Sequence, residues 1–454
     1  MQSRVCPLFI IEIDMYKISK YSRVFDDIDD DIVIYNTINR SLIALSRSYF
    51  IDNYTLVDNI PEDEIDTLRE CGFFGDRIDY NALEQHYETV DTLIISLETL
   101  LSCNLSCPYC YQIGNDHSKS IIKRDSLDLL YEYVKKVNSI THLKFLTLKV
   151  LGGEPSVNWG IANYIIEKLY NFCQKNGITF NLMVDTNCTL IEDYLQLKHY
   201  DSVLFTVPLT YKECHNAFRH YRSGAGTYDE IIENVNRLHQ SLKNCSIVFR
   251  YNMDASNIGK FSDYIQDLKK RVGFTPIISP NYTLNLGCGT FQNELSHEDF
   301  IKWCSSDFID LMVDAGWPIV ITPVTLSSKC QYRQKYSLKL FSDGTVGACA
   351  MNFFDKTRPT LKEVVDNLDH IDEYWNNAKG YSLLSQKKCR TCSSLFLCAG
   401  AYTNPCIKSL NLQECIPDRN IGVDLKLFLQ HYVKYSNAGY DDLFVGFNDY
   451  NTYK

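Results

Sequence analysis

Three cysteines with close and regular spacing are the residues best suited to chemistry in this chain. They are Cys103, Cys107 and Cys110, within the stretch CNLSCPYC. Three thiolates spaced as C-x3-C-x2-C on a short loop can turn toward one point. This arrangement suits a four-iron, four-sulfur (4Fe-4S) cluster in which one iron lacks a protein ligand. The alternative is a zinc site completed by a histidine, for which His117 is the nearest candidate.

A second set of cysteines lies toward the C-terminal end. Its members are Cys330, Cys349, Cys389, Cys392, Cys398, Cys406 and Cys415. Such an ordered series predicts metal ligation, and two zinc ribbons are one arrangement that would use it. The other eight of the eighteen cysteines are scattered through apolar or mixed segments. We expect those thiols to be small buried hydrophobic groups.

The elements that position the first cysteine group alternate between two kinds of segment. Apolar runs expected as strands lie at 92–98, 143–151, 180–186, 202–207, 246–252 and 275–279, and amphipathic runs expected as helices at 126–137, 159–172, 227–238 and 258–272. This alternation predicts an α/β fold built around a parallel sheet. Six units rather than eight predict a partial (β/α)6 barrel of the TIM type. Because ligands bind at the carboxyl ends of parallel strands, chemistry is expected in the loop after the first strand, which holds the cysteines.

The second predicted strand runs into Gly152-Gly153-Glu154-Pro155. Two glycines let a backbone approach a ligand closely, and a glutamate accepts hydrogen bonds from an ammonium group. An ordinary tight turn is the alternative. The two loops together resemble those of the radical S-adenosylmethionine (SAM) superfamily, whose signature is C-x3-C-x2-C with an aromatic residue, here Tyr109, before the last cysteine.

This resemblance implies that SAM chelates the open iron through its amino and carboxylate groups. The reduced cluster then cleaves SAM to a 5′-deoxyadenosyl radical, which abstracts a substrate hydrogen in an oxidoreductase-type reaction. The residues expected to hold SAM are Tyr109, Gly152, Gly153, Glu154, Asn187, Thr206, Arg219 and Arg250. The residues that act catalytically on the substrate are not identified.

Residues 215–231 resemble a histidine-x3-arginine and glycine-x-glycine-threonine segment of the peptide-modifying members of this superfamily. The resemblance implies that Arg219 meets the methionine carboxylate. The chain departs from the pattern where the fourth strand ends in Val207-Pro208-Leu209, since those relatives tend to have an aspartate-glycine pair there.

Residues 330–415 resemble the SPASM domain, which binds auxiliary 4Fe-4S clusters. The family pattern assigns Cys389, Cys392, Cys398 and Cys415 to one cluster and Cys330, Cys349 and Cys406 to the other. Tyr402 stands where the pattern has a cysteine, and Cys330 has no second cysteine after it. If three thiolates hold the second cluster, its free iron can bind a substrate cysteine, which favours thioether formation. Cys288 or Cys304 is an alternative fourth ligand.

The first 90 residues look like a small separate module. Strands are expected at 7–14 and 31–36, followed by a helix within 61–74. In peptide-modifying relatives such a domain adds the leader of a precursor peptide as an edge strand. A segment that caps the barrel is the alternative. The predicted organisation is therefore a leader-recognition module at 1–90, the barrel at 91–320, and a SPASM domain with a C-terminal helix at 321–454.

Charge and hydropathy limit the partners that we expect. The net charge of −11 makes a large basic surface for nucleic acid unexpected. No segment reads as a signal peptide or a membrane span, which predicts a cytoplasmic protein in a reducing compartment. The predicted partners are a precursor peptide and an electron donor such as flavodoxin or ferredoxin.

The predicted function is a radical SAM maturase that installs a thioether in a ribosomally made peptide. One alternative is sulfatase maturation, although Ala350 follows Cys349 where that group commonly has an aspartate base. Others are carbon-carbon crosslinking and epimerisation. A metal-binding protein that only interacts with peptides is the non-enzymatic alternative.

Overall fold

A computed structural model describes residues 17–28, 31–75, 78–80, 90–112, 120–283, 295–323, 331, 334–355, 357–374, 390–398 and 423–448. A large sheet with the strand order β11-β10-β9-β8-β7-β6-β12-β13 organises this part of the chain. The strands are β6 (Thr92–Glu98), β7 (Phe145–Leu151), β8 (Thr179–Asp185), β9 (Val203–Pro208), β10 (Cys245–Met253), β11 (Ile277–Tyr282), β12 (Leu338–Leu340) and β13 (Val346–Gly347). Neighbours from β6 to β11 are all parallel, which confirms the predicted α/β partial barrel with six βα units.

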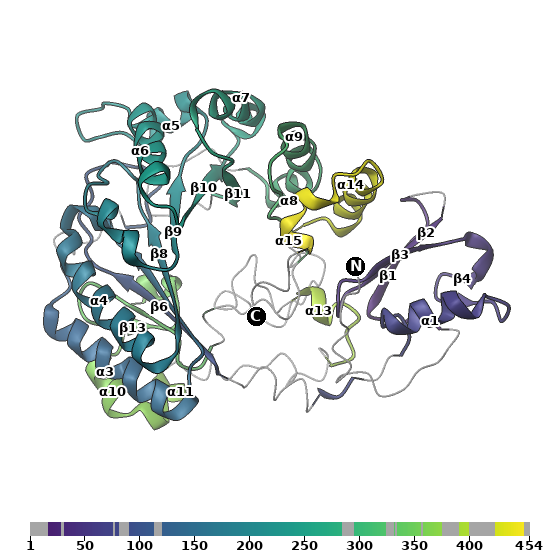
Figure 1. The fold of residues 1–454 in the computed structure, drawn as a ribbon, viewed down its shortest axis with the longest axis horizontal. Helices are drawn as coiled ribbons and strands as arrows, with labels where there is room; N and C mark the ends of the chain where they lie inside the picture. The colour runs from purple at the N-terminus through teal and green to yellow at the C-terminus, as the bar shows by residue number, and fades with distance from the viewer. Residues whose placement is uncertain are drawn as a thin grey trace.

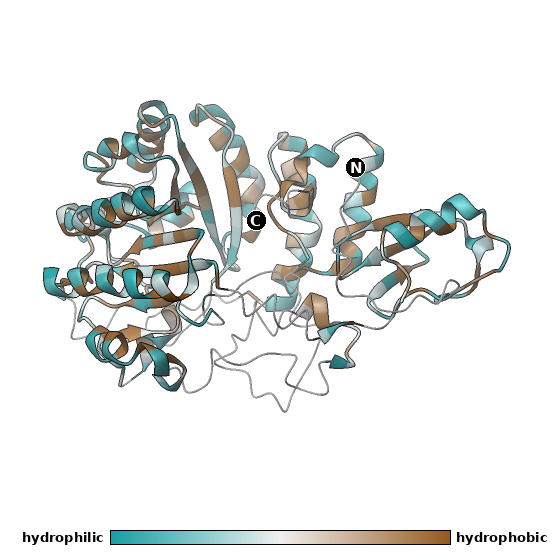
Figure 2. Ribbon diagram, turned by 60° about the horizontal axis from the view of Figure 1, so that its bottom comes forward, coloured by the Kyte–Doolittle hydropathy of each residue, from teal (hydrophilic) through white to brown (hydrophobic). Residues whose placement is uncertain are grey.

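Helices cover the outer face of this sheet (Figure 1). They include α3 (Arg124–Thr141), α4 (Trp159–Asn176), α5 (Lys212–Phe218), α6 (Tyr228–Ser241) and α7 (Phe261–Arg271), whereas α8 (His297–Ser305) and α9 (Asp307–Ala315) follow β11 and lie beside α14 (Leu425–Asn437). In α3 the buried residues recur every three or four positions, from Leu127 through Leu130 and Val134 to Val137. This spacing places one apolar stripe against the sheet. Figure 2 shows hydrophobic strands covered by helices with hydrophilic outer faces.

The strands place apolar and polar side chains on opposite faces. In β7 the fully buried residues are Leu146, Leu148 and Val150, whereas Lys149 between them is only half-buried. Because successive side chains of a strand point to opposite faces, the first set packs under the helices. The other face lines the inside of the partial barrel, and its polar residues gather toward the carboxyl ends of the strands.

A hairpin completes the sheet beside β6. Leu340 of β12 pairs with Val346 of β13 across a turn in which Gly344 has a φ of 85°. Glycine adopts this left-handed conformation without the steric cost of a Cβ atom, so the predicted Asp343-Gly344 hairpin is confirmed. The pairing of β12 with β6 was not predicted. It is parallel and sets Leu338 opposite Ile95.

The N-terminal region forms an antiparallel sheet in the order β1-β2-β3 and a small two-stranded sheet. Its elements are β1 (Ser22–Phe25), β2 (Ile32–Asn36), β3 (Leu42–Leu45), β4 (Phe50–Asp52), β5 (Thr55–Leu56) and α1 (Glu62–Glu70). The structure confirms the predicted strand at 31–36 and the helix within 61–74. The strand predicted at 7–14 lies outside the described residues.

C-terminal segments pack against this N-terminal region (Figure 1). They include α13 (Leu395–Cys398), α14 and α15 (Val445–Asn448), whereas α10 (Leu361–Asp366) and α11 (Ile371–Tyr374) lie beside α3 of the barrel. The Arg23 guanidinium donates to Ser394 Oγ over 2.7 Å, and the Tyr21 ring meets the Phe396 ring edge to face at 5.2 Å. The segment around α13 thus contacts the N-terminal sheet through a hydrogen bond and an aromatic pair.

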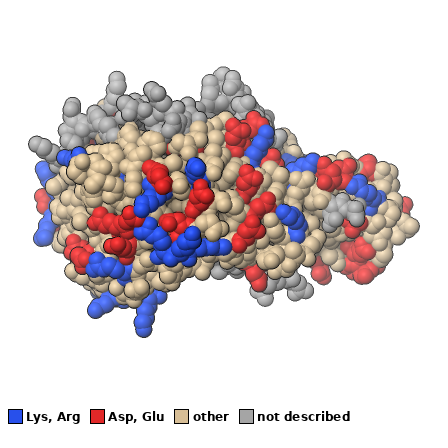
Figure 3. Space-filling view, turned by 90° about the horizontal axis from the view of Figure 1, so that it is seen from above, with Lys and Arg blue, Asp and Glu red and all other residues tan. Residues whose placement is uncertain are grey.

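The surface carries charges of both signs. On the face in Figure 3, Lys and Arg lie among Asp and Glu over the barrel helices. One example is Asp229, which pairs with both Lys212 and Arg271. Among the described residues, no helix combines the length and the apolar character that crossing a membrane requires.

Candidate active site

The loop after β6, residues 99–112, carries the three closely spaced cysteines and is called the cluster loop below. Cys103, Cys107 and Cys110 form no disulfide among the described residues, and each is partly exposed. The Leu105 backbone N–H donates to Cys103 Sγ over 3.4 Å. Burial raises the pKa of the Cys103 thiol to about 11, so a thiolate there needs a metal or another cation to stabilise it.

Two neighbouring segments hold the cluster loop in place. On one side, the Ser106 N–H donates to the His220 carbonyl over 2.9 Å. On the other side, the Gly153 N–H donates to the Leu100 carbonyl over 2.7 Å, and the Glu154 N–H to the Ser102 carbonyl over 2.9 Å. The glycine-rich loop therefore forms backbone hydrogen bonds directly before Cys103.

The two glycines are required by this close approach. A Cβ atom on Gly153 would lie 2.2 Å from the Ser102 carbonyl oxygen, and one on Gly152 would lie 2.5 Å from the Leu100 carbonyl oxygen. Both obstacles are backbone atoms of the cluster loop, which cannot rotate away as a side chain can. The ordinary tight turn that the sequence left open does not explain this contact.

Glu154 is a buried carboxylate surrounded by donors. Its Oε1 accepts from the Ser156 N–H and hydroxyl, the Thr186 hydroxyl at 2.7 Å and the Tyr194 hydroxyl at 3.0 Å. Its Oε2 accepts from the Asn187 N–H at 2.6 Å. Oε1 is thus saturated, whereas Oε2 has room for a further donor such as an ammonium group. Tyr194 was missed by the sequence analysis, because it lies forty residues away in a segment without a motif.

Asn187 links Glu154 to the first cysteine. Its side-chain amide donates to Asn104 Oδ1 over 2.8 Å and approaches Cys103 Sγ at 3.8 Å. Hydrogen bonds to a ligating sulfur tune the reduction potential of an iron-sulfur cluster. The structure therefore brings together Cys103, Glu154 and Asn187, which the sequence predicted as one site.

Tyr109 and Arg219 meet on the other side of the loop. Arg219 Nη1 donates to the Tyr109 hydroxyl over 3.2 Å. Burial alone would lower the pKa of Arg219, but Tyr109 and the thiols of Cys107 and Cys103 outweigh it, and the pKa is raised. The guanidinium is therefore a fixed cation beside the cysteines, and its buried Nε has no hydrogen-bond partner in the part of the chain that the structure describes. A ligand carboxylate would find a donor here.

His215 supports Arg219 from one helical turn away. It is fully buried, its Nε2 lies 3.1 Å from the Thr227 hydroxyl, and that hydroxyl donates to the Arg219 carbonyl over 2.6 Å. Burial lowers the pKa of His215 well below its usual value, followed by the effect of the Arg219 charge. The imidazole thus stays neutral in the folded protein.

This predicts a pH-dependent contribution to stability. The unfolded chain protonates His215 below about pH 6.5 while the folded chain does not, so stability falls as the pH is lowered through that value. The slope is at most about 1.4 kcal/mol per pH unit. We expect the thermal midpoint to drop less between pH 7.5 and 5.5 in His215→Gln than in the unaltered protein. If the thermal midpoints of the two proteins fall equally over this pH range, His215 is not the buried neutral group that we describe.

Arg250 and Thr206 stand farther along the strand ends. The Arg250 Nε is buried and has no hydrogen-bond partner among the described residues, and the Thr206 carbonyl accepts from the Thr186 N–H over 3.1 Å. The sequence missed an ion pair beside them, in which Lys149 Nζ lies 2.9 Å from Asp185 Oδ2. The sequence feature that could have indicated this pair is a charged residue, Lys149 in β7 and Asp185 in β8, at a strand position that faces the inside of the barrel.

The C-terminal cysteines are only partly described. Cys330, Cys389, Cys406 and Cys415 lie outside the described residues, as does the side chain of Cys398. The hairpin that precedes Cys349 pairs with β6 next to the cluster loop, whereas Cys392 belongs to the segment that packs on the N-terminal region.

The donor chemistry of the cluster loop suits an iron-sulfur cluster. It offers three thiols on one loop, an N–H bond to one sulfur, and a buried carboxylate and guanidinium on either side. Among the described residues, no three His, Cys, Asp or Glu side chains meet as a set for a single metal ion. Cys103, Cys107 and Cys110 remain the residues that would hold the cluster.

Comparisons with known proteins agree with this site. The model of the Radical SAM superfamily matches residues 97–268, which include the cluster loop and the strands up to β10. A search of curated proteins found no match.

Solved structures share the fold. Native anSMEcpe with bound AdoMet and Kp18Cys peptide is 17% identical, with a TM-score of 0.53 over 79% of this chain and 99% of that one. Native anSMEcpe with bound AdoMet is also 17% identical, with a TM-score of 0.50 over 77% and 98%. Streptococcus suis SuiB bound to precursor peptide SuiA is 15% identical, with a TM-score of 0.46 over 88% and 98%. At these identities the likeness concerns the fold.

Proposed function

Because this chain is a radical SAM enzyme, with its radical SAM domain at residues 97–268, we propose that it modifies a ribosomally made precursor peptide. The modification that we propose is a thioether crosslink from a peptide cysteine. The contact between the cluster loop and the Gly152–Glu154 loop is the observation that best supports a SAM-cleaving enzyme.

The side chains around the cluster loop have distinct roles in this proposal. Cys103, Cys107 and Cys110 hold the 4Fe-4S cluster, which together with SAM supplies hydrogen-abstracting chemistry when bound. Glu154 Oε2 accepts from the amino group of SAM, and Arg219 donates to its carboxylate. Tyr109 covers one side of the site. A flavodoxin or ferredoxin is the proposed electron donor.

A peptide substrate is supported by the fold and by the N-terminal region. A structure with the same fold, that of anSMEcpe, holds AdoMet together with the Kp18Cys peptide. In this chain the three-stranded N-terminal sheet has β1 and β3 as its edge strands. An edge strand offers unpaired backbone groups to an extended peptide. We therefore assign leader binding to residues 1–90.

Thioether formation is the finer part of the proposal. It depends on the C-terminal cysteines 330, 349 and 406 holding an auxiliary cluster with one iron free for a substrate thiolate. Cys304, one alternative fourth ligand, is 2% exposed within the hydrophobic core of α8, which favours keeping that iron open. Cys288 lies outside the described residues.

Formylglycine formation is the nearest rival within the same enzyme class. Ala350 follows Cys349, so a carboxylate base is missing at the position where that activity commonly has one. Carbon-carbon crosslinking and epimerisation would use the same SAM site. Only the product separates them, because a thioether consumes the peptide thiol and removes two hydrogens per crosslink.

The direct test is co-expression with a short cysteine-containing reading frame found beside the gene. After anaerobic purification, mass spectrometry of the peptide should show the loss of two hydrogens and a thiol that no longer reacts with an alkylating reagent. A peptide that loses two hydrogens but keeps a free thiol would replace the thioether by another crosslink.

Cys406→Ala should separate cleavage of SAM from modification of the peptide. We expect 5′-deoxyadenosine to form still, because the cluster loop is intact, while the crosslinked peptide is lost. Cys304→Ala is the matched control, since it removes a buried core thiol and should retain product. If Cys406→Ala keeps full product and Cys304→Ala loses it, the ligand assignment is wrong.

A further inference from the structure

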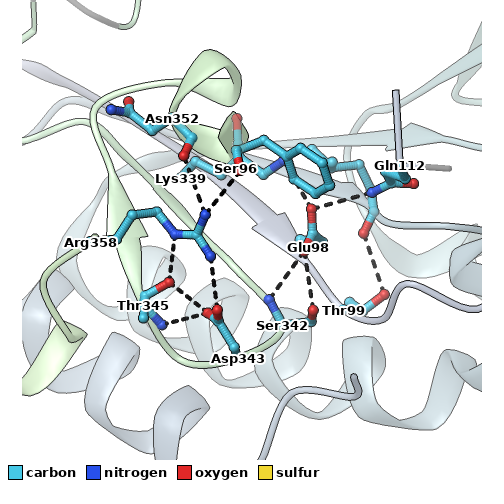
Figure 4. A network of polar contacts seen from close by, with 12 residues as sticks. Ser96, Glu98, Thr99, Gln112, Lys339, Ser342, Asp343, Thr345, Asn352 and Arg358 are labelled. Atoms are coloured by element: carbon cyan, nitrogen blue, oxygen red, sulfur yellow. Dashed lines mark hydrogen bonds and ion pairs between the residues drawn. The ribbon is translucent and has the colours of Figure 1, made fainter. Parts of the chain in front are cut away.

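A buried ion pair joins β6 to the added strand β12 beside the cluster loop. Lys339 Nζ lies 3.0 Å from Glu98 Oε2, and the two side chains are 0% and 1% exposed. The ammonium has no hydrogen bond of good geometry among the described residues, so the contact is mainly an electrostatic one. Figure 4 shows the pair between the hairpin and the cluster loop.

The Glu98 carboxylate ties both ends of the loop to the hairpin. Glu98 is the last residue of β6, directly before the loop begins. Its Oε2 also accepts from Gln112 Nε2 at 3.3 Å, two residues after Cys110. Its Oε1 accepts from the Ser342 N–H at 3.3 Å and the Ser342 hydroxyl at 3.1 Å. One carboxylate thus joins the start of the loop, its end and the hairpin (Figure 4).

The Lys339 ammonium sits among three aromatic rings from the same segments. Its Nζ lies 4.6 Å from the ring centre of Phe341, 5.8 Å from that of Tyr111 and 5.9 Å from that of Phe353. Tyr111 follows Cys110 directly, and its ring meets Phe353 edge to face at 5.1 Å. Aromatic faces attract a cation, so this cage fixes the ammonium between the loop and the hairpin.

A second cation fixes the far side of the cage. Arg358 donates to the carbonyls of Asn352 and Phe353 over 3.2 Å, and its guanidinium lies 4.1 Å from the Phe341 ring centre. Asn352 Oδ1 in turn accepts from the Cys349 N–H at 3.0 Å. Lys339 is therefore a common neighbour of the two segments that follow Cys110 and Cys349.

A buried ion pair seldom adds net stability over apolar residues of the same size, because both charges lose their hydration. Here the ion pair fixes the position of two segments relative to each other, since each of its contacts is with the cluster loop or with the hairpin. We propose that Lys339, held by Glu98, is a positioning residue that locks the cluster loop to the segment carrying Cys349. The inference rests on the radical SAM site and not on a peptide substrate.

The charges of Lys339 and Glu98 should affect a measurable quantity, the midpoint potential of the cluster. Reduction adds an electron to the cluster on Cys103, Cys107 and Cys110. A nearby cation stabilises that added negative charge, whereas an unpaired carboxylate opposes it. Lys339→Met removes the cation and leaves Glu98, so the midpoint potential of this cluster is lowered. Freed from its partner, the loop also opens more readily to solvent.

The test uses the full chain, reconstituted anaerobically with iron and sulfide. The potential is read from the electron paramagnetic resonance signal that responds to added SAM, and loop opening from hydrogen exchange of peptides within 98–112 and 338–353. Lys339→Met should lower the potential and speed exchange in both segments, while exchange in α4 stays unchanged. Lys339→Arg, which keeps the charge, should restore the potential toward that of the unaltered protein.

Lys168→Met is the matched control, because it removes a lysine paired with Asp128 on the outer helices. It should change neither the potential nor the exchange. If Lys339→Met does not fold, the variant carrying both Glu98→Gln and Lys339→Met leaves no unpaired charge and should fold, yet still show faster loop exchange. If Lys339→Met lowers the thermal midpoint but changes neither the midpoint potential of the cluster nor the hydrogen exchange of the loop, the pair contributes only to packing and the proposal is wrong.

Discussion

Cys107→Ala is expected to reduce 5′-deoxyadenosine formation below the detection limit. In the proposed site each thiolate of the cluster loop would hold a different iron, so the loss of one would leave two ligands for a cluster that already has an open iron. We also expect the iron content of the reconstituted protein to fall by one cluster. The measurement is chromatographic quantification of 5′-deoxyadenosine with dithionite and SAM, alongside iron counting.

Cys245→Ser controls for the loss of a thiol as such. Cys245 is the first residue of β10, at the end of the strand away from the cluster loop, and its thiol donates to the Leu238 carbonyl at 3.9 Å. This variant should keep its iron and form 5′-deoxyadenosine at the rate of the unaltered enzyme. Retained cleavage in Cys107→Ala, or zinc in place of iron in the purified protein, would overturn the assignment of the loop.

Gly153→Ala is expected to lower 5′-deoxyadenosine formation by roughly 100-fold. A methyl group would lie 2.2 Å from the Ser102 carbonyl oxygen and 2.5 Å from that of Leu101, so the backbone before Cys103 must move. That movement also breaks the bond from the Glu154 N–H to the Ser102 carbonyl, which aligns the carboxylate with the loop. Cleavage and SAM affinity should fall together.

Gly160→Ala is the matched control, seven residues on within α4. A Cβ atom there meets nothing within 4 Å, and a helical alanine is about 1 kcal/mol more favourable than glycine. Cleavage should be unaltered and the thermal midpoint slightly raised. If both alanine variants cleave SAM equally well, the close approach of the two loops has no part in catalysis.

The local signals of the sequence were strong enough to predict the barrel. The βα alternation located the six parallel strands β6 to β11, because strands buried between helices and a barrel interior are apolar runs bounded by turns. The cluster loop and the glycine-rich loop followed from their spacing and from their place after the first two strands. Asn187 and Arg219 were predicted from motifs and lie beside Cys103 and Tyr109.

Contacts between distant segments could not be predicted. Tyr194 reaches Glu154 from a loop with no recognisable pattern, and Lys339 reads as an ordinary polar residue in a short strand. Its burial follows only from the pairing of β12 with β6, which depends on the tertiary fold rather than on local pattern. The metal ligands 330, 389, 406 and 415 remain predictions from spacing.

The place of β12 beside β6 bears on how the protein assembles during synthesis. More than half of the chain is synthesised between Ile95 and its partner Leu338, so β6 has no β12 to pair with until late in synthesis. Until then β6 is an open edge with unpaired amides, the kind of surface from which intermolecular aggregation begins. A fragment that stops at residue 320 would keep that edge bare, and chaperones or low temperature would be needed to keep it in solution.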